Sequence, residues 1–332
     1  MGFESIEGQE RAGRQLAGLL KSGRLPHALL FLGSAGTGRL EMARRLAAAL
    51  LCPDSTGADC RLLAGNAHPD YTQVGLPEGR QSLPLQVVRD LQHTAGLRPV
   101  RADRRVFVVN DAERMTDEAA NAFLKLLEEP PGRCVFILIA SSLRRVPETI
   151  ISRCRLVRFA NLPQAALSRR LTEEGYADDD AHWLAGRCWG APGLALRSAR
   201  EGLHERNREL LDRLASAAPE DNLELADWLA DLAKEAGAGS ARDSLQDLLE
   251  CLAVYYRDLA VLAAAPEDDC PLVNRDREGA MRQRAAAAGD ADDYLDLADT
   301  VVETIEMIGA NAQMRLALDR MFTRLCGAEP QT

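Results

Sequence analysis

The clearest chemical signal in the sequence is a glycine-rich turn. Residues 33–40 read Gly-Ser-Ala-Gly-Thr-Gly-Arg-Leu, after an apolar run and before an Ala/Leu-rich stretch. Through Gly33, Gly36 and Gly38 the turn fits the phosphate-binding frame G-x-x-x-x-G-K-[ST] up to its last two positions. In this frame, backbone N–H groups and the start of the following helix surround phosphate. A glycine turn used only for tight packing is the alternative.

The last two positions of the frame are altered in this chain. The frame's lysine reaches the β- and γ-phosphates of ATP, and its Ser or Thr ligates Mg²⁺. Arg39 and Leu40 stand at these positions. Arginine keeps the charge but carries it on a bulky planar head, and a leucine side chain offers a metal ion no ligand. We therefore expect a degenerate phosphate-binding loop that no longer supports hydrolysis.

A second polar pair follows the apolar run Val106–Val109. Asn110 and Asp111 come directly after it, where a hydrolysing P-loop site has an aspartate near Mg²⁺ and a glutamate that polarises the attacking water. Asparagine is a weak, neutral metal ligand, and aspartate is one methylene shorter than the glutamate base. We therefore expect no intrinsic ATPase and no bound cofactor, although residual affinity for ATP or ADP stays open.

Hydrophobic periodicity indicates the elements that position these residues. Near-continuous apolar runs are typical of parallel strands that are buried on both faces. Helical spacing separates the runs, which predicts an α/β sheet over roughly the first 160 residues. The predicted strands are Ala28–Leu32, Val106–Val109 and Val135–Ala140, and the predicted helices are 5–24, the stretch ending at Leu51, and Asp117–Leu127.

The rest of the chain is predicted to be helical. Short helices over residues 163–200 are followed, from about residue 203, by long Leu/Ala-periodic helices. We expect His182, Trp183 and Trp189 to pack the first of these helical parts, and a base-stacking platform is the alternative. The acidic tracts 178–180 and 267–269 are interpreted as solvated loops.

Charge and composition limit the partners of the chain. Hydrophobic residues make up 46% of the 332 residues, and the net charge of −10 excludes a polycation that coats nucleic acid. Residues 98–158 hold twelve Arg/Lys against eight Asp/Glu, so any contact with phosphate is expected from the first half. Because no membrane span or basic-then-apolar leader is evident, we expect a cytoplasmic protein, away from membranes, with reduced cysteines.

Longer motifs resemble those of bacterial DNA polymerase III clamp-loader subunits, which are AAA+ proteins. The segments that carry the resemblance are Phe3-x-x-Ile6-x-Gly8-Gln9, Leu25 to Phe31, Asn121 to Pro131, and Pro147-x-Thr149-Ile150-Ile151-Ser152-Arg153-Cys154. Residues 121–131 match the family's N-A-L-L-K-x-L-E-E-P-P segment almost letter for letter. The resemblance implies a RecA-like AAA+ domain (1–162), a small helical lid (163–202) and a helical collar (203–332) within a ring-shaped heteropentamer.

Within this family, the altered ATP site favours the inactive delta-prime type over the active gamma/tau ATPase. The family's sensor-2 arginine would fall near Leu194, which is a further departure from an ATPase. The resemblance implies that Ser152-Arg153-Cys154 supplies an arginine finger: Arg153 would reach the γ-phosphate of ATP in a neighbouring gamma/tau subunit. The alternative is that Arg153 belongs to a solvated basic face with Arg144, Arg145, Arg155 and Arg158.

The resemblance also implies a function in DNA replication. The partners would be gamma/tau and delta subunits and, through the complex, the sliding clamp and primed DNA; this chain would be a non-catalytic, non-hydrolysing stator of the holoenzyme. Two other functions stay open, an active gamma/tau-like ATPase and an AAA+ adaptor outside the replisome.

Cysteines raise the question of zinc. Gamma/tau and delta-prime subunits often carry a four-cysteine zinc module, of which this chain keeps only Cys52 and Cys60, with His68 nearby. Structural zinc needs four ligands, so we expect no metal. Four more cysteines lie in apolar surroundings and are predicted to be core thiols, namely Cys134, Cys188, Cys251 and Cys326.

Overall fold

The computed structural model describes residues 3, 6–52, 57–77, 80–235, 241–265, 270–288, 290–310 and 312–327. The chain divides into two compact units. The first unit comprises Met1–Leu162 and Ala191–Gly193, and the second comprises Pro163–Gly190 and Leu194–Thr332. The lid helices are therefore grouped with the collar, and a separate lid over residues 163–202 stays a prediction.

The first unit contains a parallel sheet with the strand order β2-β3-β4-β1-β5. The strands are β1 (Ala28–Leu32), β2 (Tyr71–Val74), β3 (Arg105–Val109), β4 (Cys134–Ala140) and β5 (Arg155–Arg158). The three central strands are the three that the apolar runs predict, which confirms the α/β class. Hydrophobic runs do not predict the two edge strands.

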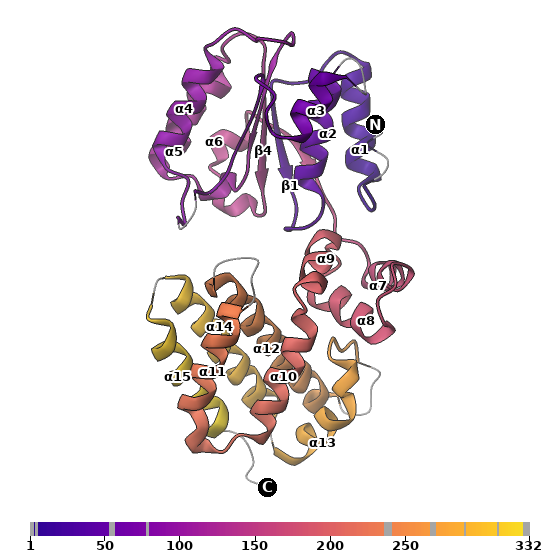
Figure 1. Ribbon diagram of the computed structural model, residues 1–332, viewed down its shortest axis with the longest axis vertical. Coiled ribbons are helices and arrows are strands. Elements are labelled where there is room, and N and C mark those ends of the chain that lie inside the picture. The colour runs from indigo at the N-terminus through magenta and orange to yellow at the C-terminus, as the bar shows by residue number, and fades with distance from the viewer. Residues whose placement is uncertain are drawn as a thin grey trace. The chain divides into compact units, whose positions relative to one another are not determined.

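Helices cover both faces of this sheet (Figure 1). One face carries α1 (Glu10–Lys21), α2 (Arg39–Leu51) and α3 (Ala58–Ala64), and the other carries α4 (Leu85–Ala95), α5 (Asp117–Glu128) and α6 (Glu148–Ile151). Successive strand residues point to opposite faces, so Phe31 is buried with Leu46 of α2 while Leu30 is buried with Phe123 of α5.

The first helix is shorter than the predicted 5–24. It ends where Gly23 adopts φ 65° and where Gly23 and Arg24 donate to the carbonyls of Leu20 and Leu19. A left-handed glycine of this kind closes a helix because it satisfies the last carbonyls and turns the chain away.

The second unit is helical over the residues that the structure describes. Its helices are α7 (Gln164–Glu173), α8 (Asp178–Arg187), α9 (Pro192–Arg200), α10 (Leu203–Ser216), α11 (Asn222–Glu235), α12 (Ala241–Ala264), α13 (Glu278–Ala288), α14 (Ala291–Gly309) and α15 (Met314–Gly327). α12 packs along α14, and α11 packs against α15. The core between them is formed by side chains such as Leu248, Leu252 and Tyr256.

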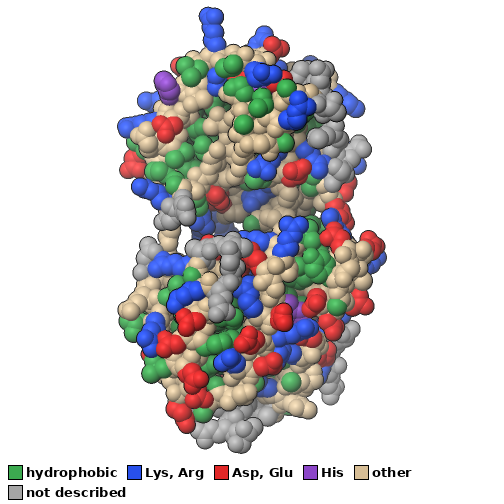
Figure 2. All heavy atoms as spheres, in the orientation of Figure 1, with side chains coloured by type: hydrophobic (Ala, Val, Ile, Leu, Met, Phe, Trp, Pro, Cys, Tyr) green, Lys and Arg blue, Asp and Glu red, His purple; other side chains and the backbone are tan. Residues whose placement is uncertain are grey.

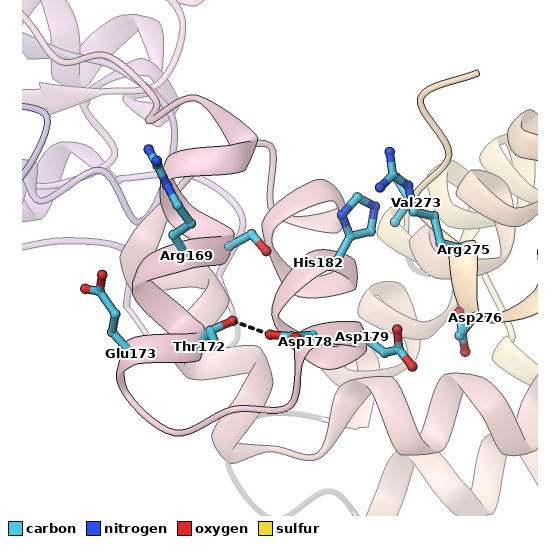
Figure 3. Close-up of a pocket in the computed structure, with 10 residues that line it drawn as sticks. Arg169, Thr172, Glu173, Asp178, Asp179, His182, Val273, Arg275 and Asp276 are labelled. Atoms are coloured by element: carbon cyan, nitrogen blue, oxygen red, sulfur yellow. Dashed lines mark hydrogen bonds between the residues drawn. The ribbon is translucent and has the colours of Figure 1, made fainter. Parts of the chain in front are cut away.

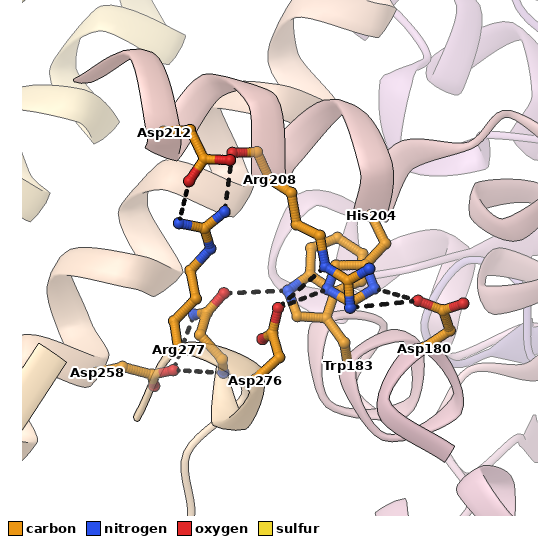
Figure 4. Close-up of polar contacts among 9 residues, drawn as sticks. Asp180, Trp183, His204, Arg208, Asp212, Asp258, Asp276 and Arg277 are labelled. Carbon is orange, nitrogen blue, oxygen red and sulfur yellow. Dashed lines mark hydrogen bonds and ion pairs between the residues drawn. The ribbon is translucent and has the colours of Figure 1, made fainter. Parts of the chain in front are cut away.

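A polar network joins α8 to α10 and to the short helix η5 (Arg275–Arg277) inside the second unit (Figure 4). His204 lies between two carboxylates, with Nδ1 2.7 Å from Asp180 and Nε2 3.5 Å from Asp276. The ring of Trp183 stacks on His204 at 4.3 Å. The expectation that the tract 178–180 is a loop is wrong, because Asp178–Asp180 form the first turn of α8, where the helix dipole favours carboxylates.

The aromatic residues of the lid differ from one another. Trp183 is buried, as expected, and His182 donates from Nε2 to the carbonyl of Leu272 at 2.9 Å. Trp189, in contrast, is 63% exposed, so the expectation that it packs the domain is wrong for this residue. The other acidic tract, Glu267–Asp269, lies outside the described residues.

The charged side chains of the second unit are mixed in sign. Figure 2 shows acidic and basic groups side by side over its helices on the visible face, so that face has no field of a single sign. Among the described residues, no helix is long and apolar enough to cross a bilayer.

Candidate functional site

The glycine turn joins the carboxyl end of β1 to the start of α2. Gly36 and Gly38 have φ values of 77° and 88°, a region that side chains other than glycine rarely adopt. Gly33 is needed for a different reason, since a Cβ there would lie 2.7 Å from the carbonyl oxygen of Phe159. The backbone of the expected phosphate-binding loop is therefore formed by the three glycines named from the sequence.

Asn110 and Asp111 lie at the same edge of the sheet as this turn. Leu32 of β1 is in register with Ala140 of β4, and Val109 of β3 is in register with Leu138, so the carboxyl ends of these strands meet there. Asp111 has φ 53° and accepts a hydrogen bond from the backbone N–H of Leu76. The structure thus brings the glycine turn and the Asn110-Asp111 pair together, as the sequence predicts.

A second acidic residue, Glu113, enters the site, and the sequence analysis did not single it out. Glu113 accepts hydrogen bonds at Oε1 from the backbone N–H of Ser141, at 2.9 Å, and from its hydroxyl. Its other oxygen is buried and, among the described residues, has no hydrogen-bond partner. Spacing in the sequence did not indicate this contact, because the left-handed backbone at Asp111 that precedes it is a property of the fold.

Arg39 lies within the electrostatic influence of two carboxylates of the site. Burial lowers the pKa of its guanidinium, while the charges of Glu113 and Asp111 act in the opposite direction. Its Nη1 group is buried without a hydrogen-bond partner in the described part of the chain. Burial and the neighbouring Glu113 charge raise the pKa of Asp111. The single positive charge of Arg39 therefore does not neutralise both carboxylates, Asp111 and Glu113.

This donor set does not match that of a Mg²⁺–ATP site. Leu40 packs against the core beneath α2 instead of offering an oxygen, and Asn110 is neutral. The charges that act on Arg39 are those of Glu113 and Asp111 in its own chain. The carbonyl of Gly36 accepts a hydrogen bond from the N–H of Gly193, at 2.8 Å. The residues present therefore do not fit a Mg²⁺-bound nucleotide.

Leu194 lies in α9 of the second unit, where the family's sensor-2 arginine would be expected. The next arginine in that helix, Arg197, donates to the carboxylate of Asp247 in α12 at 3.2 Å. That guanidinium is therefore already engaged within its own unit.

Arg153 lies near the amino ends of the strands, whereas the glycine turn lies at their carboxyl ends. It precedes β5, and Arg155 of β5 is in parallel register with Leu29 of β1. Gly33 follows β1 and is four residues beyond Leu29, which separates the two levels by roughly 13 Å of extended chain. Arg153 is therefore directed away from the glycine turn of its own chain.

The guanidinium of Arg153 donates hydrogen bonds to several acceptors. Nη2 donates to Oε1 of Glu128 at 2.7 Å, and Nη1 donates to the carbonyl of Thr149 at 3.0 Å. The Ser152 hydroxyl donates to Thr149 as well and lies 3.4 Å from Nη1. Cys154 is half-buried, and desolvation raises the pKa of its thiol to about 12.

The other arginines of the predicted basic face are divided between the two edges. Arg155 begins β5, next to Arg153, whereas Arg158 ends this strand. Arg144 and Arg145 lie in the short helix η3 (Leu143–Arg145), beyond the carboxyl end of β4. A single continuous face of these arginines is therefore not formed.

The sequence profile of a family described as "DNA polymerase III, delta subunit" matches residues 8–163. The DNA polymerase III delta-prime subunit of Pseudomonas aeruginosa is 35% identical over 196 residues, which cover 56% of this chain and 60% of the relative. That of Escherichia coli is 31% identical over 227 residues, or 68% of this chain and 66% of the relative.

This chain belongs to the DNA polymerase III clamp-loader subunits of the delta-prime type. It is also similar to the gamma/tau subunit of Mycobacterium tuberculosis, with 31% identity over 370 aligned residues, 97% of this chain and 60% of the relative. The delta-prime-type chain thus spans about 60% of the length of the Pseudomonas and Mycobacterium relatives.

Cys52 and Cys60, the two cysteines that raised the question of zinc, are neighbouring thiols. Cys60 is hydrogen-bonded to Cys52, and burial together with this contact raises the pKa of Cys52 to about 12. His68 is buried, with Nδ1 accepting from the N–H of Asp70 and Nε2 3.7 Å from Asp59. In the described part of the chain, no three metal-binding side chains are grouped closely enough to share an ion. Residues 53–56 of the intervening loop lie outside the described residues.

The other predicted core thiols are buried, as expected: Cys134, Cys188, Cys251 and Cys326.

A pocket of about 520 Å³ lies between α7, α8 and η5 of the delta-prime-type chain (Figure 3). Both signs of charge line it, including Arg169, Asp179 and Arg275. Its polar groups bond within the unit: the Thr172 hydroxyl donates to Asp178 at 3.1 Å, and His182 donates to Leu272. Nothing in this lining indicates a particular ligand. The candidate site therefore remains at the sheet, with the glycine turn at the carboxyl ends of the strands and Arg153 near their amino ends.

Proposed function

We propose that this chain is the non-hydrolysing delta-prime-type subunit of a clamp loader and that Arg153 serves ATP hydrolysis in a neighbouring gamma/tau subunit. The observation that carries the proposal is the position of Arg153 at the amino edge of the sheet, opposite its own glycine turn. An arginine placed there is available to another chain. The proposed partners are gamma/tau and delta subunits and, through the complex, the sliding clamp and primed DNA.

The proposed chemistry takes place on the neighbour's nucleotide. Water attacks the γ-phosphorus, the bond from this atom to the bridging oxygen of ADP breaks, and ADP and inorganic phosphate leave. Negative charge grows on the bridging and γ-oxygens, and a guanidinium supplied in trans stabilises it. Arg153 would contribute this charge, while Ser152 shapes the turn before it. Because its own phosphate-binding loop is degenerate, this chain would not open and close with nucleotide and would remain in one conformation during the neighbour's cycle.

The deciding experiment compares Arg153→Ala with Arg155→Ala in the reconstituted complex. Both changes remove one exposed arginine from the same edge. Clamp loading and DNA-stimulated ATP hydrolysis should fall about tenfold or more for Arg153→Ala and stay near the unmodified level for Arg155→Ala. Equal losses in the two variants would favour a general basic face, and an unchanged Arg153→Ala complex would refute the finger. Co-purification of the chain with gamma/tau and delta subunits would exclude an adaptor outside the replisome.

An active gamma/tau-like ATPase is the second candidate. It is supported by the alignment with a gamma/tau subunit over 97% of the chain and by the carboxylates of Asp111 and Glu113, which remain near Arg39. Mg²⁺-dependent hydrolysis by the purified chain, lost in Arg39→Ala and kept in Arg155→Ala, would establish this alternative and exclude the stator.

A further inference from the structure

We propose that Glu128 is a positioning residue that fixes the guanidinium of Arg153 in the orientation in which it meets the neighbour's phosphate. The inference rests on the proposed function of Arg153 in trans and adds a residue to it. Glu128 ends α5 and is separated from Arg153 by 25 residues, yet its Oε1 lies 2.7 Å from Nη2.

An unrestrained arginine is a poor donor to a fixed acceptor. Its side chain loses up to about 2 kcal/mol of rotamer entropy when it is held in one conformation. The bonds to Glu128, Thr149 and Ser152 impose this order before a neighbour arrives. A guanidinium has five N–H groups, so the three bonds leave two N–H groups for phosphate oxygens.

The backbone around Glu128 is itself anchored. Nε2 of His27, just before β1, donates to the carbonyl of Leu127 at 2.9 Å. Leu126 and Leu127 are buried beneath the sheet, and the two prolines Pro130 and Pro131 follow. The acceptor that holds Arg153 is thus attached to the rigid sheet instead of to a mobile loop, as a precise position for the guanidinium requires.

Local helix preference does not explain an acidic residue at this position. The last turn of a helix has negative potential, so a carboxylate at the end of α5 is unfavourable there. The charge of Arg153 offsets this penalty. A residue that contradicts a local preference and is matched by a specific distant partner is a candidate for function.

A role in stability alone is a weak explanation for the pair. The side chains of Arg153 and Glu128 are 38% and 50% exposed. Ion pairs with such exposure contribute at most about 1 kcal/mol to folding. Removal of the carboxylate should therefore leave the fold intact, which allows the effect on the neighbour's hydrolysis to be measured separately.

The test uses the reconstituted complex of this chain with gamma/tau and delta subunits, sliding clamp and primed DNA. Glu128→Ala should lower kcat for DNA-stimulated ATP hydrolysis about three- to fivefold, as loss of a half-exposed pair allows, with little change in KM for ATP. Glu128→Gln keeps an oxygen that accepts from Nη2 and should retain most of the activity. Glu129→Ala is the matched control, because it removes the same charge one residue away, and should behave like the unmodified chain.

A double-mutant cycle then assigns the effect to the pair. Combining Glu128→Ala with Arg153→Ala should give no loss beyond that of Arg153→Ala alone. The proposal is overturned if the ATP hydrolysis rate of the Glu128→Ala complex equals that of the Glu129→Ala complex, or if Glu128→Gln is as impaired as Glu128→Ala. A higher rate for Glu128→Ala would also overturn it, because it would mean that Glu128 competes with phosphate for Arg153. An unaffected Arg153→Ala complex would instead refute the proposed function on which this inference rests.

Discussion

At the scale of single residues, Asp111 carries a charge that the folded chain disfavours. Burial and the Glu113 carboxylate raise its pKa above the ordinary 3.8. A raised folded-state pKa means that stability is greatest below the unfolded value and falls as the pH rises through the folded value. At neutral pH the ionised Asp111 therefore destabilises the first unit.

Asp111→Asn should raise the free energy of unfolding at pH 7.5. We expect a gain of less than about 1 kcal/mol, because the carboxyl is only half buried, and a smaller gain as the pH falls toward 4. Asparagine tolerates the left-handed backbone and still accepts from the N–H of Leu76. Hydrogen exchange of amides in β1 and β3 measures the effect, with the exposed Asp103→Asn as control. Faster global exchange of the variant at pH 7.5 would contradict the prediction.

Sequence reasoning found the residues that follow a motif and missed those that depend on the fold. Gly33, Arg39 and Asp111 occupy fixed places relative to a strand end, so spacing is sufficient to name them. Glu128 meets Arg153 only because α5 and α6 pack on the same face of the sheet. No periodicity in the sequence reports such a pairing.

At the scale of elements, Gly33 allows the end of β5 to lie against the turn after β1. A Cβ there would lie 2.7 Å from the carbonyl oxygen and 2.8 Å from the Cβ of Phe159. Backbone atoms cannot yield as a flexible side chain would, so Gly33→Ala should destabilise the first unit by about 1–3 kcal/mol.

Gly18→Ala provides the control for this substitution. Gly18 lies within α1, and a Cβ added there would meet no atom of another element within 4 Å. The change should stabilise the chain by about 0.4–1 kcal/mol, through lower entropy of the unfolded chain. Urea unfolding followed by circular dichroism compares the two variants. Similar shifts of both midpoints would show that the contact with Phe159 is not limiting.

The edge strands show why the sheet was only partly predictable. β1, β3 and β4 are covered on both faces and have apolar sequences such as Cys134–Ala140, in which every residue is buried. β5 lies at the edge and reads Arg-Leu-Val-Arg, with both arginines exposed. An edge strand needs fewer apolar residues, so its sequence alone does not separate it from a turn.

At the scale of the whole molecule, the second unit depends on a network that crosses from α8 to η5. Burial alone would raise the pKa of Asp276, but the nearby His204 and the hydrogen bond from Arg208 hold it at about 2 (Figure 4). A lowered pKa stabilises the fold above the unfolded value of 3.8, and this contribution is lost as the pH falls toward 2.

Asp276→Asn should therefore lower the free energy of unfolding at pH 7 by about 1 kcal/mol, after allowance for solvent screening of a half-buried group. The deficit should shrink as the pH falls from about 4 toward 2. All three tryptophans of the chain, Trp183, Trp189 and Trp228, lie in the second unit, so their fluorescence during urea unfolding follows this unit. Asp179→Asn, one residue before Asp180 in the first turn of α8, controls for loss of an acidic side chain. A deficit that is constant from pH 7 to pH 3 would assign the effect of Asp276 to packing, because only the charged contacts with His204 and Arg208 weaken as the carboxylate is protonated.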